Sequence, residues 1–382
     1  MRQTIELKGL TWDHPRAWSG LYAETRRFNQ SQTEIEVHWE KHTLRGFEST
    51  PIAETAEKYD LIILDHPFMG DAAASNVLVN LYHHIDKFDF VSRADQYVGF
   101  SFQSYEYAGG LWALPVDAAC QTAVLRPDLL GRQVPKSFED VFELAESGGL
   151  GLSMAEPHAF MNFLAIAGRL GGDISGAGEV FLPNDIAKEA LVILRRLARH
   201  IPERAFDWSS IGLLESMATS NEVKYCPIIF CFNTYSQSTI LGRHLLKFAK
   251  LPLATKEKSP GGSVIGGTGI AISESCNNIQ AALKVIWHFA GSGAQKRMGS
   301  HGGQPAHRAI WRPDATKTIN GSFFDECRSD METAVLRPRH AGYMYMQNTV
   351  GDLLRQDTMN QNQPVQSVVQ KIEEHFQESK VG

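Results

Sequence analysis

The 382-residue sequence has no long apolar run and no excess of basic charge. No stretch reaches the ~18 uncharged apolar residues that a membrane-spanning helix needs. Lys and Arg number 37 against 43 Asp and Glu, which gives a formal net charge of −6. A general nucleic-acid binder usually carries a basic stripe, so we expect no nucleic acid among the partners of this chain.

Paired cysteines are also missing, because the five cysteines are odd in number and none forms a C-x-x-C pair. A disulfide framework that uses all of them is impossible, and no zinc spacing is present. Free cysteine is among the most buried residue types, so we expect buried thiols. They are Cys120, Cys226, Cys231, Cys276 and Cys327.

The sequence contains no nucleotide P-loop, no H-E-x-x-H motif and no G-x-S-x-G motif. The glycine-rich stretch 261–269 has no following Lys, and a predicted strand, Gly269–Ser273, follows it where a dinucleotide site would need a helix. We expect these glycines to let the backbone approach another backbone or a ligand closely. We predict neither a cofactor nor a metal.

The N-terminus shows no apolar run of signal-peptide length and no small-residue cleavage site. It leads almost directly into the first predicted strand. Either the chain is cytoplasmic or a signal lies outside this sequence, and the residues leave both alternatives open.

The first third of the chain alternates between strand and helix patterns. Strands are predicted at Ile5–Leu10, Glu34–Trp39 and Tyr59–Asp65, and helices at 16–30 and 43–58, the second with a break at Pro51. This order implies a mostly parallel sheet with helices on both sides. In such sheets ligands bind outside the carboxyl ends of the strands, so the loops after the strands are the first candidates for a site.

A second α/β pattern begins after residues 105–117, which are typical of a tight hairpin leading into an extended crossing segment. Ser137 is predicted to cap a helix, with Asp140 at the capping-box position. Further helices are predicted at 158–171, 184–200 and about 278–289, and a strand at Tyr225–Phe232.

Two histidines, His14 and His66, follow an Asp and precede a Pro in loops after strands. Three roles stay open for them: hydrogen bonding to a ligand, loop structure, and catalysis or metal binding. Asp13 and Asp65 could instead cap the helices that follow, which is common for Asp at such positions.

Several aromatic residues lie in or beside predicted loops and strand ends. Aromatic faces pack against sugar rings and, by cation–π contact, against quaternary ammonium groups, although core packing is the alternative for each residue. They are Trp12, Phe68, Trp112, Phe232 and Tyr235.

Five segments, in this order and spacing, resemble motifs of the extracellular (family 1) solute-binding proteins of ABC transporters, in the group that includes maltose- and oligosaccharide-binding proteins. The segments are Tyr107–Pro115, Ala123–Leu130, Val134–Asp140, Gly266–Ser273 and Gly303–Arg308. The resemblance extends from the first strand to about residue 350.

The resemblance implies an α/β fold of two lobes, each a mostly parallel sheet flanked by helices, as in periplasmic binding proteins. Hinge crossings are expected near 113–118, 253–262 and 305–313, with closure on the ligand. The expected N-terminal lobe comprises 1–114 and 260–308, and the expected C-terminal lobe 115–259 and 309–382.

The resemblance also implies ligand contacts from loops at the inner lobe edges. Trp12 and Tyr235 would stack on the ligand, while the polar members of the set would bind its hydroxyl groups. The full set is Trp12, Asp13, His14, Asp65, His66, Phe68, Met69, Asp117, Gln121, Asn233, Tyr235, Gly266, Gly267 and Thr268.

The function implied is that of a substrate-binding protein of an ABC importer, which binds a small solute, with carbohydrate favoured, and does no catalysis. A periplasmic location, a monomer and permease subunits as partners are expected with it. The alternatives are a binder of a quaternary amine or other small metabolite, a cytoplasmic metabolite sensor, and an enzyme that uses an Asp-His pair at 13–14 or 65–66.

Overall fold

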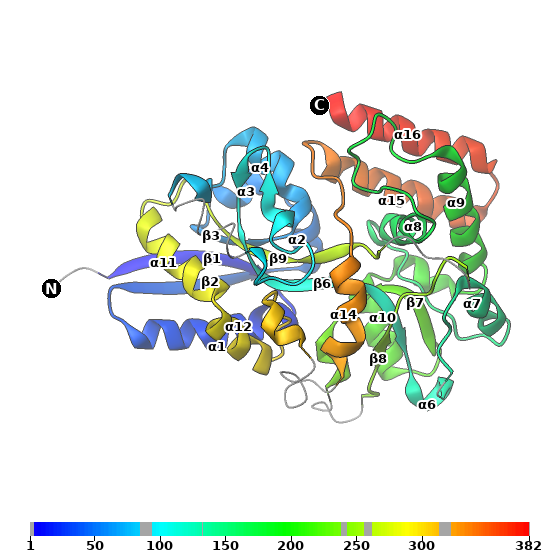
Figure 1. Ribbon diagram of the computed structural model, residues 1–382, viewed down its shortest axis with the longest axis horizontal. Helices are drawn as coiled ribbons and strands as arrows, with labels where there is room; N and C mark the ends of the chain where they lie inside the picture. Colours follow the sequence, from blue (N-terminus) through cyan, green and yellow to red (C-terminus); the bar gives the residue numbers. More distant parts are fainter. Residues whose placement is uncertain are drawn as a thin grey trace.

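The computed structural model describes residues 4–84, 94–131, 133–237, 243–255, 262–312 and 322–381. These residues form two lobes that lie side by side, with the blue and yellow segments of the chain in one and the green and red segments in the other (Figure 1). We call the lobe that holds the N-terminus the first lobe and the other the second lobe.

The first lobe is built on the strands predicted from the N-terminal third. β1 (Ile5–Trp12) pairs in parallel with β2 (Ile35–His42) and β3 (Leu61–Leu64), and β9 (Ile265–Ile272) runs antiparallel to β3. The connecting helices are α1 (Pro15–Ser31), α2 (Leu44–Ser49) and α3 (Ile52–Ala56), so the predicted break at Pro51 is confirmed. After β3 come the 3-10 turn η1 (His66–Phe68), α4 (Met69–Ser75), η2 (Leu81–His83) and η3 (Gln103–Tyr105).

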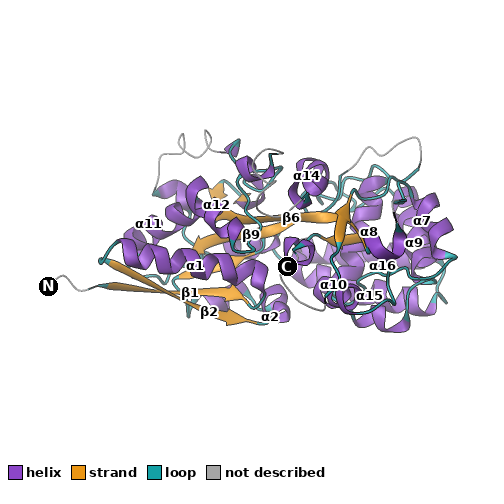
Figure 2. Cartoon of the chain, turned by 90° about the horizontal axis from the view of Figure 1, so that it is seen from below, coloured by secondary structure: helices purple, strands orange, loops and turns teal. Residues whose placement is uncertain are grey.

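One long strand joins the sheets of the two lobes. β6 (Leu114–Leu125) pairs antiparallel with β9 through residues 114–120 and with β7 (Tyr225–Phe230) and β8 (Lys247–Ala249) through residues 121–125. All of its residues are buried, and Figure 2 shows it extending from one lobe into the other. The hairpin predicted before it is also present, as β4 (Glu106–Tyr107) and β5 (Gly110–Leu111).

Helices cover the sheets in both lobes. In the first lobe, α11 (Ile279–Ala290) packs on β6 and β9, and α12 (Ser292–Ser300) packs on α1. The second lobe holds a group of four helices, namely α8 (His158–Arg169), α9 (Asn184–Ala198), α15 (Tyr343–Asn360) and α16 (Val365–Val381), in which α9 and α15 each contact the other three. The remaining elements are α6 (Pro127–Leu130), α7 (Phe138–Ala145), η4 (Glu203–Asp207), α10 (Ser210–Thr219), η5 (Asn233–Ser236), η6 (Arg308–Trp311) and α14 (Phe323–Thr333), which packs on β6 and β8.

Local sequence signals account for several boundaries. Ser137 and Asp140 form the predicted capping box at the start of α7. The prediction for α1 needs a correction, because the residue that caps it is His14, whose ring nitrogen accepts from the Arg16 amide, while Asp13 forms an ion pair with Lys41. Asp65 caps η1 as expected.

The glycine-rich segment is partly a strand, since β9 begins at Ile265 and not at the predicted Gly269. Gly267 shows the expected close approach of backbone to backbone: its φ is +107°, and a Cβ there would lie 2.4 Å from the carbonyl oxygen of Asp117.

The five cysteines are all free and buried, as predicted. Within the described ranges, no helix combines the length and apolar character that crossing a bilayer requires. The lobe boundaries expected from the sequence stay a prediction, and of the expected crossings, residues 256–261 and 313 lie outside the described residues.

Candidate ligand-binding site

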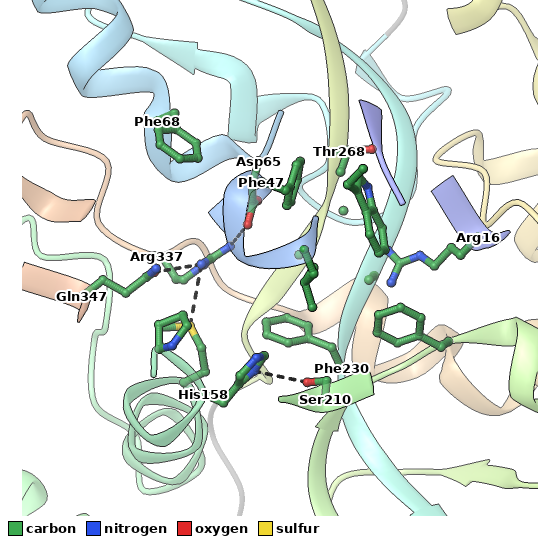
Figure 3. A pocket seen from close by; sticks show the side chains of 18 of the residues that line it. Arg16, Phe47, Asp65, Phe68, His158, Ser210, Phe230, Thr268, Arg337 and Gln347 are labelled. Atoms are coloured by element: carbon green, nitrogen blue, oxygen red, sulfur yellow. Dashed lines mark hydrogen bonds and ion pairs between the residues drawn. The ribbon is translucent and has the colours of Figure 1, made fainter. Parts of the chain in front are cut away.

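A pocket lies between the two lobes, and both contribute to its wall (Figure 3). Small-molecule sites typically combine apolar walls with a few precisely placed polar groups. The lining residues are Trp12, Arg16, Leu44, Phe47, Asp65, Phe68, Ala119, Pro157, His158, Met161, Ser210, Phe230, Phe232, Gly266, Gly267, Thr268, Arg337, Met344 and Gln347.

Aromatic rings from both lobes meet on one side of the pocket. Trp12 ends β1 in the first lobe, and Phe232 follows β7 in the second. Their ring centroids are 6.2 Å apart at 89°, and the centroid of Phe47 lies 5.6 Å from that of Trp12. The aromatic wall therefore spans the lobe boundary, where a bound ring would contact both lobes at once.

Arg16, in the first turn of α1, connects this wall to β6. Its Nε and Nη2 donate to the two carboxylate oxygens of Asp117 at 3.0 and 2.5 Å, and Nη1 donates to the carbonyl of Cys231 at 3.2 Å. Burial would lower the pKa of the guanidinium, but the Asp117 carboxylate overcomes this and raises it. The guanidinium carbon lies 4.6 Å from the ring centroid of Phe232 and 5.9 Å from that of Trp12.

A polar group of side chains forms another side of the pocket. Asp65 directly follows β3, and its carboxylate accepts from the backbone amide of His66 at 2.8 Å and from Arg337 Nη2 at 2.5 Å. His66 Nδ1 lies 2.9 Å from the same carboxylate. Arg337 comes from the segment between α14 and α15, and its Nη1 donates to Gln347 Oε1 at 2.9 Å.

The charge states in this group follow from burial and pairing. Burial alone would raise the pKa of Asp65, but Arg337 and His66 hold it below its ordinary value, so the carboxylate is ionised at neutral pH. Burial lowers the pKa of His66 to about 4, so this imidazole is neutral at neutral pH.

The second lobe adds a histidine and a serine from two helix starts. His158 begins α8 and Ser210 begins α10, and their Nδ1 and Oγ atoms are 3.3 Å apart. Burial lowers the pKa of His158 to about 4, with a smaller contribution from Arg337, so this ring is also neutral at neutral pH.

Six of the predicted site residues line the pocket, and they come from the ends of β1 and β3 and from β9. They are Trp12, Asp65, Phe68, Gly266, Gly267 and Thr268. Two others do not line the pocket but contact residues that do: Asp117 pairs with Arg16, and His66 binds the Asp65 carboxylate. Met69 and Gln121 are buried and lie outside the pocket lining.

The remaining predicted residues form contacts beside the pocket. The His14 ring stacks on Trp12 with centroids 5.4 Å apart and lies 6.2 Å from the ring of Tyr235, whose hydroxyl donates to Glu215 at 2.7 Å. Asn233 connects the lobes, because its side-chain amide donates to the carbonyl of Gly303 at 2.7 Å and its backbone amide donates to Gln304 at 3.0 Å. Asp13 is exposed and pairs with Lys41.

Sequence reasoning missed five polar lining residues: Arg16, His158, Ser210, Arg337 and Gln347. Arg16 could have been found, because it stands in the first turn after the loop that was already a candidate. The others lie near the starts of helices or between helices further along the chain, and only the tertiary fold brings them to the pocket.

No family model matches this chain, and no curated protein matches its sequence. Among solved structures, maltose-bound MalE3 of T. maritima is 18% identical, with a TM-score of 0.83 over 98% of this chain and 99% of that one. A solute-binding protein of an ABC transporter from Thermotoga lettingae TMO, bound with α-D-tagatose, is 14% identical, with a TM-score of 0.83 over 99% and 100%.

A third structure, a solute-binding protein of an ABC transporter from Agrobacterium radiobacter K84 in complex with ribitol, is 17% identical, with a TM-score of 0.79 over the whole of both chains. The chain has the two-lobed fold of ABC-transporter solute-binding proteins. The predicted two-lobed α/β fold class is therefore confirmed, while the described strands β7 and β8 of the second lobe run antiparallel to β6. At these identities the comparison shows a shared fold and not a shared ligand, so the ligand of this chain must be inferred from its own pocket residues.

Proposed function

We propose that this chain is the substrate-binding protein of an ABC importer, and that it binds a small carbohydrate between its lobes by hinge closure without catalysis. The observation that carries the proposal is the pocket itself, where aromatic rings from both lobes stand beside a cluster of charged and amide side chains. Similar structures that hold maltose, tagatose and ribitol support it.

Both parts of the pocket suit a sugar. The rings of Trp12 and Phe232 offer apolar faces on which the C–H surface of a pyranose can stack, while the guanidinium of Arg337 and the side-chain amide of Gln347 offer N–H donors to its oxygens. Hydrogen bonds to charged groups are stronger than those between neutral groups, so this combination gives both affinity and orientation.

The same residues disfavour a quaternary amine. The cation that such a ligand would place over the aromatic rings is already present, because the Arg16 guanidinium lies over Phe232 and Trp12. The only carboxylate among the described lining residues, that of Asp65, is paired with Arg337. A bound amine would therefore meet a resident cation without a carboxylate left to balance it.

The two Asp-His pairs are occupied in holding the structure. His14 caps α1 and Asp13 pairs with Lys41, while His66 and Asp65 bind each other beside Arg337. We therefore propose binding without turnover. Recovery of a bound sugar in unchanged form would agree with this, whereas a converted product would contradict it.

We also propose the lobe boundaries given above, a location in the periplasm or at the cell surface, a monomer in solution, and the permease subunits of an importer as partners. Fractionation of the source cells tests the location, and sedimentation of the purified chain tests the monomer. A cytoplasmic location would favour the metabolite-sensor alternative.

Thermal unfolding against a panel of sugars, polyols, amino acids and quaternary amines tests the central proposal. A ligand at 100 times its Kd adds about 2.7 kcal/mol of stability, which corresponds to a shift of roughly 5 °C for a chain of this size. We expect shifts with sugars or polyols and their loss in the Trp12→Ala variant, whose folding is checked by circular dichroism.

A Trp39→Ala variant is the matched control, because Trp39 lies outside the lining of the interlobe pocket. No shift with any sugar or polyol, or an equal shift in the Trp12→Ala variant, would overturn the proposal.

A further inference from the structure

Two N–H donors of the pocket residues have no acceptor. Trp12 Nε1 and Arg337 Nε are buried, and neither has a hydrogen-bond partner in the part of the chain that the structure describes. Their side chains belong to residues that are 3% and 4% exposed. Buried donors without acceptors destabilise a protein, so such groups in a pocket point to a ligand that supplies the acceptors.

The acceptors of the pocket, in contrast, are in use. The Asp65 carboxylate already binds the His66 amide, the His66 ring and Arg337. The side-chain oxygen of Gln347 accepts from Arg337, and the Asp117 carboxylate behind the wall is held by Arg16 at both oxygens. The side-chain hydrogen-bonding capacity left over is thus mainly that of donors.

Arg16 adds to the excess of hydrogen-bond donors over available acceptors. Three of its N–H groups donate to Asp117 and the Cys231 carbonyl, and an arginine has five N–H donors in all. The lining side chains carry two guanidinium groups and one carboxylate. With Asp117 included, the charges balance, so the hydrogen-bonding inventory rather than net charge distinguishes one solute from another.

We infer that the solute of this pocket carries a carboxylate, and that it is a sugar acid rather than a neutral sugar. The inference rests on the proposed function and specifies its substrate class. An ionised carboxylate offers about four acceptor sites and no donor, so it matches Trp12 Nε1 and Arg337 Nε. Each hydroxyl of a neutral sugar brings a donor that needs an acceptor, and the pocket has few to give.

Matched pairs of sugars that differ only at C6 test the inference on the purified chain. D-Glucose with D-glucuronate, and D-galactose with D-galacturonate, are compared by isothermal titration calorimetry, together with neutral D-glucuronamide. We expect a uronate to bind at least about tenfold more tightly than its neutral partner, since hydrogen bonds to charged groups are the stronger ones. The amide, which adds donors, should bind more weakly than the acid.

Two conservative variants test whether these two N–H donors bind the carboxylate of the solute. Trp12→Phe keeps an aromatic ring but removes Nε1–H, and Arg337→Lys keeps the positive charge but removes Nε–H. Each should weaken uronate binding about tenfold or more and so reduce the ratio of uronate affinity to neutral-sugar affinity. Trp39→Phe and Arg355→Lys are the controls, because both residues lie outside the pocket, and they should leave uronate binding unchanged.

The outcomes separate this inference from the proposed function. Neutral sugars that bind as tightly as the acids, or variants that leave the preference for acids intact, overturn the inference while the proposed function stands. Binding of a neutral sugar from the wider panel without binding of any uronate does the same. Absence of binding by every sugar and sugar acid overturns both.

Discussion

Replacing Arg16 with methionine should destabilise the folded chain strongly, because it leaves the Asp117 carboxylate buried without its partner. The two side chains are 5% and 8% exposed, and the guanidinium donates to both carboxylate oxygens. Removing one partner of a buried ion pair typically costs about 3–5 kcal/mol. At about 2 °C per kcal/mol for a chain of this length, Tm should fall by roughly 6–10 °C.

The loss should also depend on pH. Burial raises the pKa of the Asp117 carboxyl even with Arg16 beside it, and removal of the guanidinium raises it further. A folded-state pKa above the unfolded value means that the folded variant binds the proton more readily, so stability is lost as pH rises. The deficit of Arg16→Met relative to the unchanged chain should therefore be larger at pH 8 than at pH 5.

Urea unfolding at both pH values measures these effects. The double variant Arg16→Met, Asp117→Leu removes both charges and should recover much of the loss, because apolar replacement of a buried pair is often tolerated. Arg204→Met is the control, since Arg204 pairs with Glu222 at the surface and should change stability by only about 0–1 kcal/mol. A single variant within 1 kcal/mol of the unchanged chain, or a double variant as unstable as the single one, would refute the reasoning.

Three further predictions concern other features of the fold. Burial lowers the pKa of His66 and of His158 to about 4 from 6.5, so the folded state binds fewer protons than the unfolded state between these values. The free energy of unfolding should fall as pH drops through this window, by up to roughly 3 kcal/mol for each histidine. Urea unfolding midpoints measured across this pH range check the prediction. A His158→Asn variant that loses as much stability at acid pH as the unchanged chain would contradict it. Gly267→Ala should cost more than about 2 kcal/mol, because it combines an unfavourable φ with a contact against the Asp117 carbonyl. Gly109→Ala, at a positive φ with open space around it, should cost less in the same urea experiment, and equal losses would show that the contact is unimportant. Finally, Ellman's reagent should label none of the five thiols in the native chain and all five after unfolding, since all are free and buried; rapid labelling of the native chain would show that the lobes open far enough to expose them.

Local signals in the sequence were sufficient for the strand ends beside the pocket and for several helix boundaries. Trp12 and Asp65 were predicted because each ends or follows a strand of clear apolar pattern, and the carboxyl ends of parallel strands lie at one edge of a sheet. The break at Pro51 and the capping box at Ser137 depend only on residues within a few positions, and both are confirmed.

The charged pairs at the pocket depend on contacts between distant parts of the chain. Arg337 reaches Asp65 across 272 positions of sequence, and Arg16 reaches Asp117 across 101. No periodicity encodes such pairs, because each requires the packing of both lobes and of the segment between α14 and α15. The early start of β9 was missed for a related reason: its glycines have no strand preference and are ordered by pairing with β6.

β6 supplies residues 114–120 to the sheet of the first lobe and residues 121–125 to that of the second. The sheet of each lobe is therefore incomplete without a strand that the other lobe also uses. Melting one lobe would take from the other a buried strand and its ladder of main-chain hydrogen bonds. The two lobes are thereby coupled thermodynamically, and the chain should unfold in a single cooperative transition even with the hinge closure that we propose.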